Sequence, residues 1–339
     1  FEVAFWGIRN TFYVELTTPS PTLIPFEAHR FTGFTTHLFC AILFLLAAKE
    51  EEHERLLKVL IGGAVIVSCI AVLQFYKIDI MKFVFANRNT NSLSATMGNR
   101  NFLATYFVLI LPASVCLYLQ KEKNIWLITS GFIYAGLLAA KTRGAWMAAG
   151  IMFVFIICKE LFKKRNRRSR IKVLKLVIVF LLITVVMNLF DGDVLRRIFS
   201  IKDQIQLAAE MDDSAGSSRM YIWKKTYKVF LKNWAFGIGP DHLIYEEIMM
   251  PGNNAMIADK THNISLEIAA TMGSFALISY IAFLSTFLRR WKDQMGFIYF
   301  TMILSYLIQG FFNIDTIMVL PLFWIVLGFA LSNMTEGNL

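Results

Sequence analysis

Charged residues and cysteines are scarce in this sequence. Of its 339 residues, 17% are charged and 56% are hydrophobic, which is far more apolar surface than a water-soluble core of this size can bury. The four cysteines, Cys40, Cys69, Cys116 and Cys158, all lie within apolar runs. This placement argues against a disulfide framework or a thiolate metal site. We therefore expect a membrane protein whose cysteines are small core residues.

Several common catalytic motifs are absent. The sequence has no HExxH, no Walker-type glycine-rich loop, no CxxC pair and no GxSxG elbow, which removes the most frequent hydrolase, ATPase and redox interpretations. Its five histidines lack the usual spacing of metal ligands. We expect no metal and no cofactor. The formal net charge of +10 is interpreted as a signal of membrane orientation, so no nucleic-acid partner is expected.

A cleavable signal peptide is also missing from the start of the chain. Residues 1–30 are mixed in polarity, contain Pro19 and Pro21, and have no charged leader before an apolar stretch. The sequence does not begin with Met. We expect that residue 1 lies inside a longer protein and that further helices precede it.

The sequence does contain long apolar runs. Most have a length of roughly 15–20 residues, which suits α-helices that cross a bilayer rather than the strands of a barrel. The predicted fold class is all-α, a polytopic transmembrane helix bundle with about nine spans. The run at 144–158 is short for a crossing, which predicts tilted or broken helices. The runs are 34–48, 57–75, 102–119, 125–140, 144–158, 173–190, 264–288, 295–313 and 316–332.

The distribution of Lys and Arg predicts the orientation. The segment Lys159–Lys175 is the most basic connection, so we expect it to be a cytoplasmic loop in contact with anionic lipid. Alternation then places three other basic connections, near Lys49–Lys58, Lys121–Lys123 and Arg289–Lys292, on the cytoplasmic side. The remaining polar connections, including the long loop 191–262, are expected on the extracytoplasmic face.

The long loop divides the chain into three predicted segments. Residues 1–190 form about six N-terminal spans, residues 191–262 form an extracytoplasmic loop, and residues 263–339 form about three C-terminal spans. A connection of this length is uncommon unless it is functional or disordered. Its many aromatic residues, among them Trp223 and Trp234, argue against disorder.

An amphipathic helix is expected inside this loop, from Arg219 to about Asn233, with Ser217-Ser218 as its cap. Aromatic and apolar residues recur at helical spacing, and Lys224, Lys228 and Lys232 line another face. This pattern is typical of a helix that lies on a membrane surface.

His262 is the first candidate for chemistry. It precedes a predicted span that begins near Ile264, with Thr261 or Asn263 as its N-cap. The positive end of a helix disfavours an imidazolium, so the ring is expected to stay neutral and able to accept a proton. That property suits a general base. The alternative is a histidine that only forms hydrogen bonds at a helix start.

Arg143 and Arg219 are candidates for anion binding. Arg143 lies in a turn between two short spans, where a guanidinium is costly unless it meets an anion, a carbonyl or water. Phosphate is the natural partner because arginine forms paired hydrogen bonds with its oxygens. Arg219 opens the amphipathic helix, where its charge opposes the helix dipole. The alternatives are an arginine extended to lipid headgroups and an exposed arginine, respectively.

Further polar residues are expected near the same face. Asn99 and Asn101 lie at the start of the third run, Asn263 follows His262, and Asp315 lies in the last outer turn. Helix caps and turns also explain these residues.

Five motifs resemble the O-antigen ligase and polymerase superfamily, in both their order and their spacing, over nearly the whole chain. The most specific is the pair His262-Asn263, separated by nine residues from Gly273. The others are Met97 to Ala104 with Leu111-Pro112, Thr142 to Trp146, Arg219 with Trp223, and Phe236 to Pro240.

The resemblance implies a bacterial enzyme of the cytoplasmic membrane with its active site on the extracytoplasmic face. Such enzymes transfer a glycan from undecaprenyl pyrophosphate to a glycan, lipid or protein acceptor, and are understood to need neither nucleotide nor metal. His262 would be the base, while Arg143 and Arg219 would bind the pyrophosphate. Members usually have about a dozen spans, which agrees with the expectation of missing N-terminal spans.

Within the superfamily, the protein resembles lipid A-core ligases, repeat-unit polymerases and protein O-oligosaccharyltransferases alike. A transporter or flippase of an anionic lipid-linked substrate is a more distant alternative, because outer arginines and short spans also suit such proteins. The sequence shows no repeated halves of the kind expected in a transporter. A sensor or scaffold that docks through Lys159–Lys175 is a third alternative.

Overall fold

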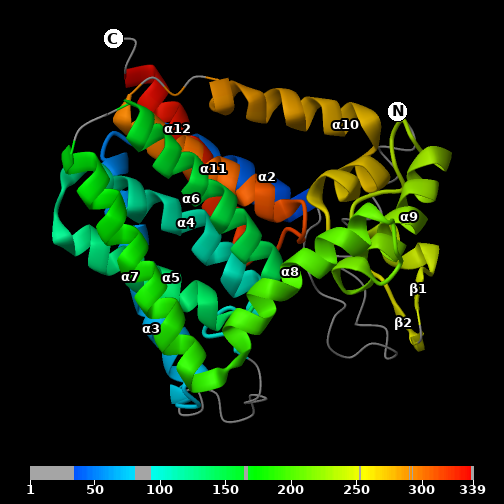
Figure 1. Ribbon diagram of the computed structural model, residues 1–339. Coiled ribbons are helices and arrows are strands. Elements are labelled where there is room, and N and C mark those ends of the chain that lie inside the picture. Colours follow the sequence, from blue (N-terminus) through cyan, green and yellow to red (C-terminus); the bar gives the residue numbers. More distant parts are fainter. Residues whose placement is uncertain are drawn as a thin grey trace. The chain divides into compact units, whose positions relative to one another are not determined.

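A computed structural model describes residues 34–80, 93–163, 167–251, 253–289, 291 and 293–336. The predicted features of residues 1–33, including the prolines, lie outside these ranges. The described part of the chain is helical apart from a short hairpin and connecting turns (Figure 1). Its α-helices are α2 (Phe34–Ala47), α3 (His53–Phe75), α4 (Arg100–Lys121), α5 (Asn124–Ala139), α6 (Arg143–Lys163), α7 (Arg167–Asp191), α8 (Asp193–Ala209), α9 (Ala215–Lys232), α10 (Ile264–Arg289), α11 (Gln294–Gly310) and α12 (Leu320–Glu336).

Each of the nine predicted apolar runs coincides with a helix. Among the described residues, five helices are long and apolar enough to cross a membrane, namely α3, α4, α6, α7 and α10. Shorter apolar helices occupy Thr36–Ala47, Asn124–Ala139 and Leu320–Thr335. The helical fold class is thus confirmed, and the number of nine spans stays a prediction.

The basic segment Lys159–Lys175 is not the loop that its composition predicts. Helix α6 continues to Lys163 and α7 begins at Arg167, so most of the basic residues extend the ends of two helices. Lysine and arginine are good helix formers, which explains why charge alone does not end these helices. Lys172 is buried, and its ammonium donates to the Leu119 carbonyl at 2.6 Å and to Glu122 at 3.1 Å.

The chain separates into two compact units. The first comprises Phe1–Leu45, Lys202–Arg289 and Gly310–Ile325, and the second comprises Leu46–Ile201, Arg290–Gln309 and Val326–Leu339. Each unit is therefore assembled from segments that are distant in the sequence.

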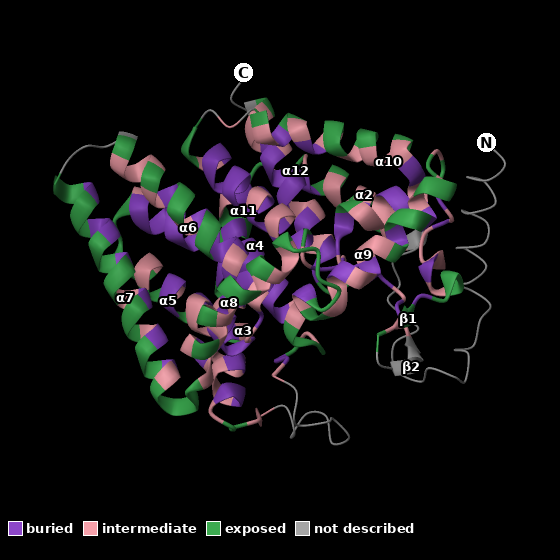
Figure 2. Cartoon of the chain, turned by 45° about the vertical axis from the view of Figure 1, so that its right-hand side comes forward, coloured by how far each residue is buried: buried purple, intermediate pink, exposed green. Residues whose placement is uncertain are grey.

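Helix α4 forms the core of the second unit. It contacts α3, α5, α6 and α7, and it is buried along most of its length (Figure 2). A helix that is apolar on all sides is expected at such a position. Helix α7, by contrast, exposes apolar side chains, among them Leu181, Leu182, Val185, Val186 and Leu189. This exposed face suits contact with lipid.

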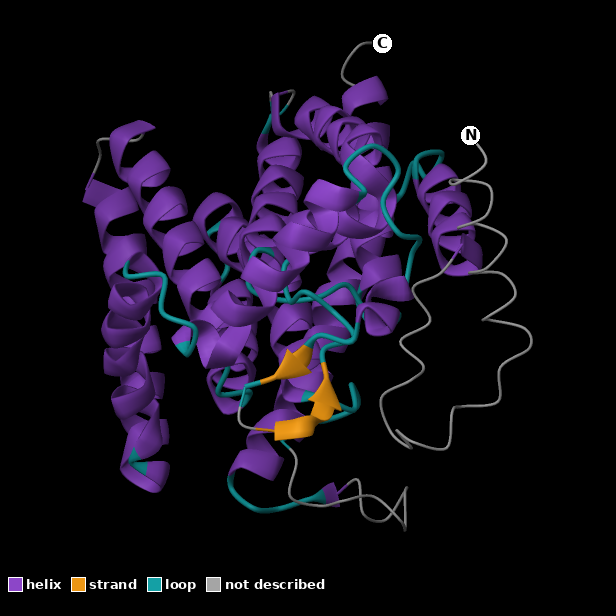
Figure 3. Ribbon diagram, turned by 90° about the vertical axis from the view of Figure 1, so that its right-hand side faces the viewer, coloured by secondary structure: helices purple, strands orange, loops and turns teal. Residues whose placement is uncertain are grey.

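The first unit contains most of the long loop, from Lys202 onward. The 3-10 helix η2 (His242–Glu246) is followed by strands β1 (Met249–Met250) and β2 (Asn253–Ile257), which pair antiparallel (Figure 3). A small core of Ile222, Leu243, Ile248 and Ala258 joins α9 to this hairpin. The sequence predicts the order of this loop but not its hairpin.

Candidate active site

His262 lies in the turn between β2 and α10, with a left-handed backbone of φ 55°. This conformation costs a residue with a side chain about 1–2 kcal/mol, and it persists where neighbouring bonds hold it. The Thr261 hydroxyl donates to the Asn263 carbonyl at 2.7 Å, and the Asn263 amide donates to the same hydroxyl oxygen at 3.1 Å. His262 is therefore held between two residues that bind each other.

Asn263 caps α10, as the sequence predicts. Its side-chain oxygen accepts a hydrogen bond from the Leu266 amide at 3.0 Å, which satisfies one of the free donors at the helix start. Asn263 itself is buried. The cap fixes the first turn of α10 directly after His262.

Buried Lys260, two residues before His262, is the centre of an ion-pair network with two partly buried carboxylates. The Lys260 ammonium binds the carboxylates of Asp241 and Glu267, the latter at 3.3 Å. Glu267 also accepts a hydrogen bond from the Thr261 amide at 2.9 Å. Burial alone lowers the pKa of Lys260, but Glu267, Asp241 and Asp259 together raise it above its ordinary value. The lysine therefore stays charged and ties α10 to η2 next to the histidine.

Helix α9 reaches the same turn through Trp223. The indole nitrogen of Trp223 donates to the Thr261 carbonyl at 2.9 Å, and the ring packs edge-on against Phe311 with centroids 5.3 Å apart. Arg219 lies one helical turn before Trp223 and thus on the same face. The first unit therefore brings the helix of Arg219 to the residue that precedes His262.

The start of α9 differs in detail from the prediction. Gly216, Ser217 and Ser218 all have left-handed backbones, with φ of 64°, 61° and 65°, so regular helix begins at Arg219 as expected. Ser214 is the cap residue of the segment assigned from Ala215, and the predicted cap of the regular helix by Ser217-Ser218 stays a prediction. Left-handed turns of this kind concentrate at functional sites.

The predicted motif Phe236 to Pro240 packs against a break in α10. At Gly273 the backbone of α10 has φ 83° and ψ 177°, a conformation that is essentially restricted to glycine. The Gly239 amide donates to the Thr271 carbonyl at 2.7 Å, and the Ser274 amide donates to the Trp234 carbonyl at 2.7 Å.

Neither glycine at this contact can carry a side chain. A Cβ on Gly273 would lie 2.5 Å from the Phe236 nitrogen, and one on Gly237 would lie 2.5 Å from the Met272 nitrogen. The spacing between His262-Asn263 and Gly273 thus reflects a physical contact between two of the motifs.

Asp315 is partly buried between α11 and α12 in the first unit. It lies within electrostatic range of Cys40 on α2 and Tyr280 on α10. Its predicted supporting role stays a prediction.

Arg143, Asn99 and Asn101 belong to the second unit. Asn99 is the N-cap of α4 and accepts the Asn101 amide at 2.8 Å. The Thr142 hydroxyl donates to the side-chain oxygen of Asn101 at 3.4 Å, and the Arg143 guanidinium donates to the Ser200 hydroxyl at 3.3 Å. The structure therefore places three predicted site residues together at the starts of α4 and α6.

Two groups of residues near these sites are not identified from the sequence. Asp241, Lys260 and Glu267 form the network beside His262, and Arg197 with Ser200 lies beside Arg143. The first group has one signal in the sequence, Lys260 directly before Thr261-His262-Asn263. The signal of the second group is the basic pair Arg196-Arg197 near the start of a polar helix.

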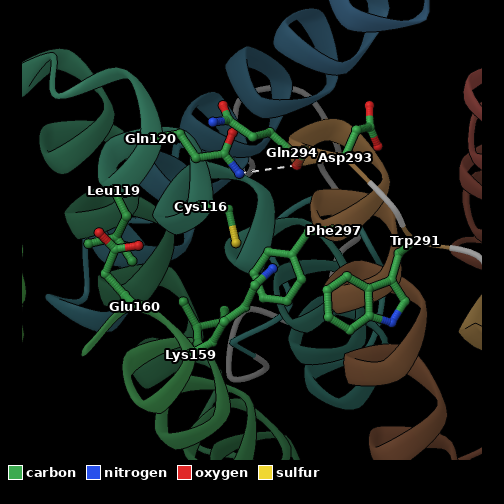
Figure 4. A pocket seen from close by; sticks show the side chains of 10 residues that line it. Cys116, Leu119, Gln120, Lys159, Glu160, Trp291, Asp293, Gln294 and Phe297 are labelled. Carbon is green, nitrogen blue, oxygen red and sulfur yellow. Dashed lines mark hydrogen bonds between the residues drawn. The ribbon is translucent and has the colours of Figure 1, made fainter. Parts of the chain in front are cut away.

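The second unit also contains a cavity of about 180 Å³ that holds none of the predicted site residues. It is lined by the C-terminal ends of α4 and α6 and the start of α11, whereas Arg143 and Asn101 lie at the opposite ends of α6 and α4. Lys159 lies over the rings of Trp291 and Phe297, and Gln120 donates to the Gln294 carbonyl at 3.1 Å (Figure 4). In the predicted orientation this cavity faces the cytoplasm.

The described residues contain no group of three or more His, Cys, Asp or Glu side chains that could hold a metal ion. The two groups offer an imidazole, guanidinium groups, amides, hydroxyls and the ion pairs of Lys260 with Asp241 and Glu267.

Comparison with known proteins agrees with the motifs. The family model described as O-antigen ligase matches residues 125–281, a range that includes Arg143, Arg219 and His262. The comparison with curated proteins gives no match. With its apolar helices, the chain is a multi-pass membrane protein of the type that acts on lipid-linked glycans. Residues 125–281 thus match the O-antigen ligase family, which agrees with the resemblance that the motifs predict.

Proposed function

We propose that this protein transfers a glycan from undecaprenyl pyrophosphate to an acceptor hydroxyl on the extracytoplasmic face of a bacterial cytoplasmic membrane. His262 acts as the base, and Arg143 and Arg219 bind the pyrophosphate. The observation that carries the proposal is the turn Thr261–Asn263, in which the two neighbours of His262 bond to each other and Thr261 also accepts a bond from Trp223 on the helix of Arg219. A fixed imidazole beside a cationic helix suits a base that acts next to an anionic leaving group.

The reaction follows from these roles. One imidazole nitrogen of His262 takes the proton of the acceptor hydroxyl as that oxygen bonds to the anomeric carbon of the glycan. The bond from this carbon to the pyrophosphate oxygen breaks, and its electron pair leaves with the lipid pyrophosphate. The guanidinium groups stabilise the charge that develops on this leaving group. The configuration at the anomeric carbon is inverted.

The test is glycan transfer by purified protein from an undecaprenyl-pyrophosphate-linked donor to candidate acceptors. We expect His262→Ala to abolish turnover while donor binding stays unchanged, because general-base catalysis typically contributes roughly 10²–10⁴-fold. Arg143→Ala and Arg219→Ala are expected to weaken donor binding. The matched control is His242→Ala, which alters a histidine of η2 outside the His262 turn.

Full turnover by His262→Ala would rule out the proposed base. Loss of both transfer and donor binding in this variant would assign His262 to donor binding instead. A thermal unfolding curve for each variant separates these outcomes from misfolding.

A further inference from the structure

The cavity of about 180 Å³ in the second unit has no part in the proposed function. Its walls come from the C-terminal ends of α4 and α6 and from the start of α11. Asp293 and Gln294 of its lining are exposed, so the cavity opens to the surface. At about 30 Å³ per molecule, this volume equals that of about six waters. The size suits one small polar group rather than a glycan chain.

The inner wall of the cavity holds a fixed positive charge. The Lys159 ammonium lies 2.8 Å from the centroid of the Phe297 ring and 4.4 Å from that of Trp291 (Figure 4). Two aromatic faces attract a cation and so keep the ammonium in place. The next residue, Glu160, also lines the cavity, and its carboxylate lies 3.7 Å from the ammonium of buried Lys172. Lys159 is therefore the cationic group that this wall presents.

Asp293 supplies a negative charge at the opening of the cavity. Its carboxylate accepts the Gly296 amide at 2.7 Å and the side-chain amide of Asn333 at 3.1 Å, which fixes it at the start of α11. In the part of the chain that the structure describes, no lysine or arginine forms an ion pair with Asp293. A ligand with charges of both signs thus meets an ammonium and a carboxylate in one lining.

An exposed apolar row of α6 leads to this lining. Ile151, Phe155 and Lys159 are four residues apart and so share one face of the helix. Ile151 and Phe155 are exposed, on a helix that is apolar enough to cross a membrane. The Phe155 ring lies 6.1 Å from that of Phe297 in the cavity wall, measured between centroids. An acyl chain along this row therefore ends next to the cavity.

We infer that the cavity binds the headgroup of a phospholipid that carries both a phosphate and an ammonium group, as phosphatidylethanolamine does. Lys159 binds the phosphate, Asp293 binds the ammonium, and an acyl chain covers Ile151 and Phe155. Trp291 agrees with this position, because tryptophan is favoured at the level of lipid headgroups. In the predicted orientation the lipid belongs to the cytoplasmic leaflet. The headgroup of phosphatidylglycerol has no ammonium for the carboxylate and fits less well.

The test measures lipid binding to the full chain, purified in detergent, by native mass spectrometry. Phosphatidylethanolamine and phosphatidylglycerol with the same acyl chains are titrated separately. We expect the wild-type chain to bind phosphatidylethanolamine about fivefold more tightly, which is the effect of one partly exposed ion pair. Glycerophosphoethanolamine, which is the same headgroup without acyl chains, should bind at least about tenfold more weakly because the apolar row gains nothing.

Two substitutions separate the two charges. Asp293→Asn should remove the preference between the lipids, because asparagine still caps a helix but carries no charge. Lys159→Gln should weaken binding of both lipids by about tenfold through loss of a charge-assisted bond, and Lys159→Arg should restore it. The matched control is Lys123→Gln, an exposed lysine between α4 and α5, which should change either affinity less than about twofold.

Equal wild-type affinity for the two lipids, or an unchanged preference in Asp293→Asn, would overturn the assignment of a headgroup with both charges. Full affinity in Lys159→Gln, or an equal loss in Lys123→Gln, would overturn the cavity as the site. Binding of glycerophosphoethanolamine as tight as that of the lipid would identify a site for a soluble molecule instead. Thermal unfolding identifies a misfolded variant, and if Lys159→Gln misfolds, Asp293→Asn and the comparison of lipids still decide.

Discussion

The turn that carries His262 is fixed by the side chains on either side of it. Thr261 and Asn263 bond to each other across the histidine, and buried Lys260 pairs with Asp241 and Glu267. Because a left-handed residue is disfavoured on its own, these bonds hold the backbone of His262 in its turn. The geometry of the proposed base therefore depends on the residues around it.

Replacing Lys260 tests this dependence. Lys260→Met leaves two partly buried carboxylates without their cation, so we expect a loss of up to about 3 kcal/mol in the free energy of unfolding. The measurement is denaturant or thermal unfolding of the protein in detergent. The control is Lys228→Met, which removes an exposed lysine of α9 and should leave the stability within about 0.5 kcal/mol of wild type.

The pH dependence of this difference provides a second test. Since the folded-state pKa of Lys260 is raised, its contribution is fully present below its unfolded value of about 10.4 and is lost only as the pH rises through the higher folded value. The difference in the free energy of unfolding between wild type and Lys260→Met should stay constant from about pH 7 to pH 9. A gap that closes within this window would contradict the ion-pair explanation.

The sequence predicts single residues where their partners are local. Asn263 is recognised as a helix cap because its bond reaches only to Leu266. The pairing of Lys260 with Asp241 spans nineteen residues, and nothing in the order of residues shows that these two side chains meet. Arg197 is missed for the same reason, since Arg143 is distant from it in the chain.

Helix α10 is interrupted at Gly273, where the backbone is not helical. The interruption allows residues 234–239 to bond to the backbone of α10, and it needs a conformation that a side chain does not tolerate. The motif Phe236 to Pro240 and the glycine after His262-Asn263 are thus two halves of one contact.

Gly273→Ala is expected to destabilise the protein by at least about 1–3 kcal/mol from the backbone conformation alone, with a further cost from the contact with Phe236. Unfolding in detergent measures this change. Gly150→Ala is the control, because Gly150 lies within α6, has open space around its Cβ position, and should be neutral or stabilised by up to about 1 kcal/mol. Equal effects of the two substitutions would contradict the proposed contact.

The sequence predicts which segments are membrane-type helices more successfully than it predicts where these helices end or which elements lie between them. The apolar runs identify the membrane-type helices because a helix needs about 20 mostly apolar residues to cross a bilayer. The basic segment Lys159–Lys175 is predicted wrongly as a loop, since lysine and arginine extend helices as readily as they occupy loops. The hairpin of β1 and β2 is too short to produce an alternating pattern that could be recognised.

The orientation of the molecule in the membrane is a prediction from its basic connections. We expect a cysteine at Lys228 of α9 to react with a membrane-impermeant maleimide in intact spheroplasts, because the long loop is predicted to be extracytoplasmic. A cysteine at Glu51, in a connection predicted to be cytoplasmic, should react only after permeabilisation. Both positions are exposed.

Labelling of the unmodified chain, which has four cysteines of its own, sets the background for this experiment. The reverse pattern, with Glu51→Cys labelled first, would place His262 on the cytoplasmic side and remove the proposed acceptor reaction from the outer face.

The ion pair between Asp241 and Lys260 has a consequence for how related enzymes diverge. It holds together the two ends of residues 242–259, the segment that contains η2 and the hairpin, next to α10. Changing the length of a loop whose ends are held together costs little free energy. A change in the length of this part between related proteins is therefore expected to leave the turn of the histidine that follows it in place.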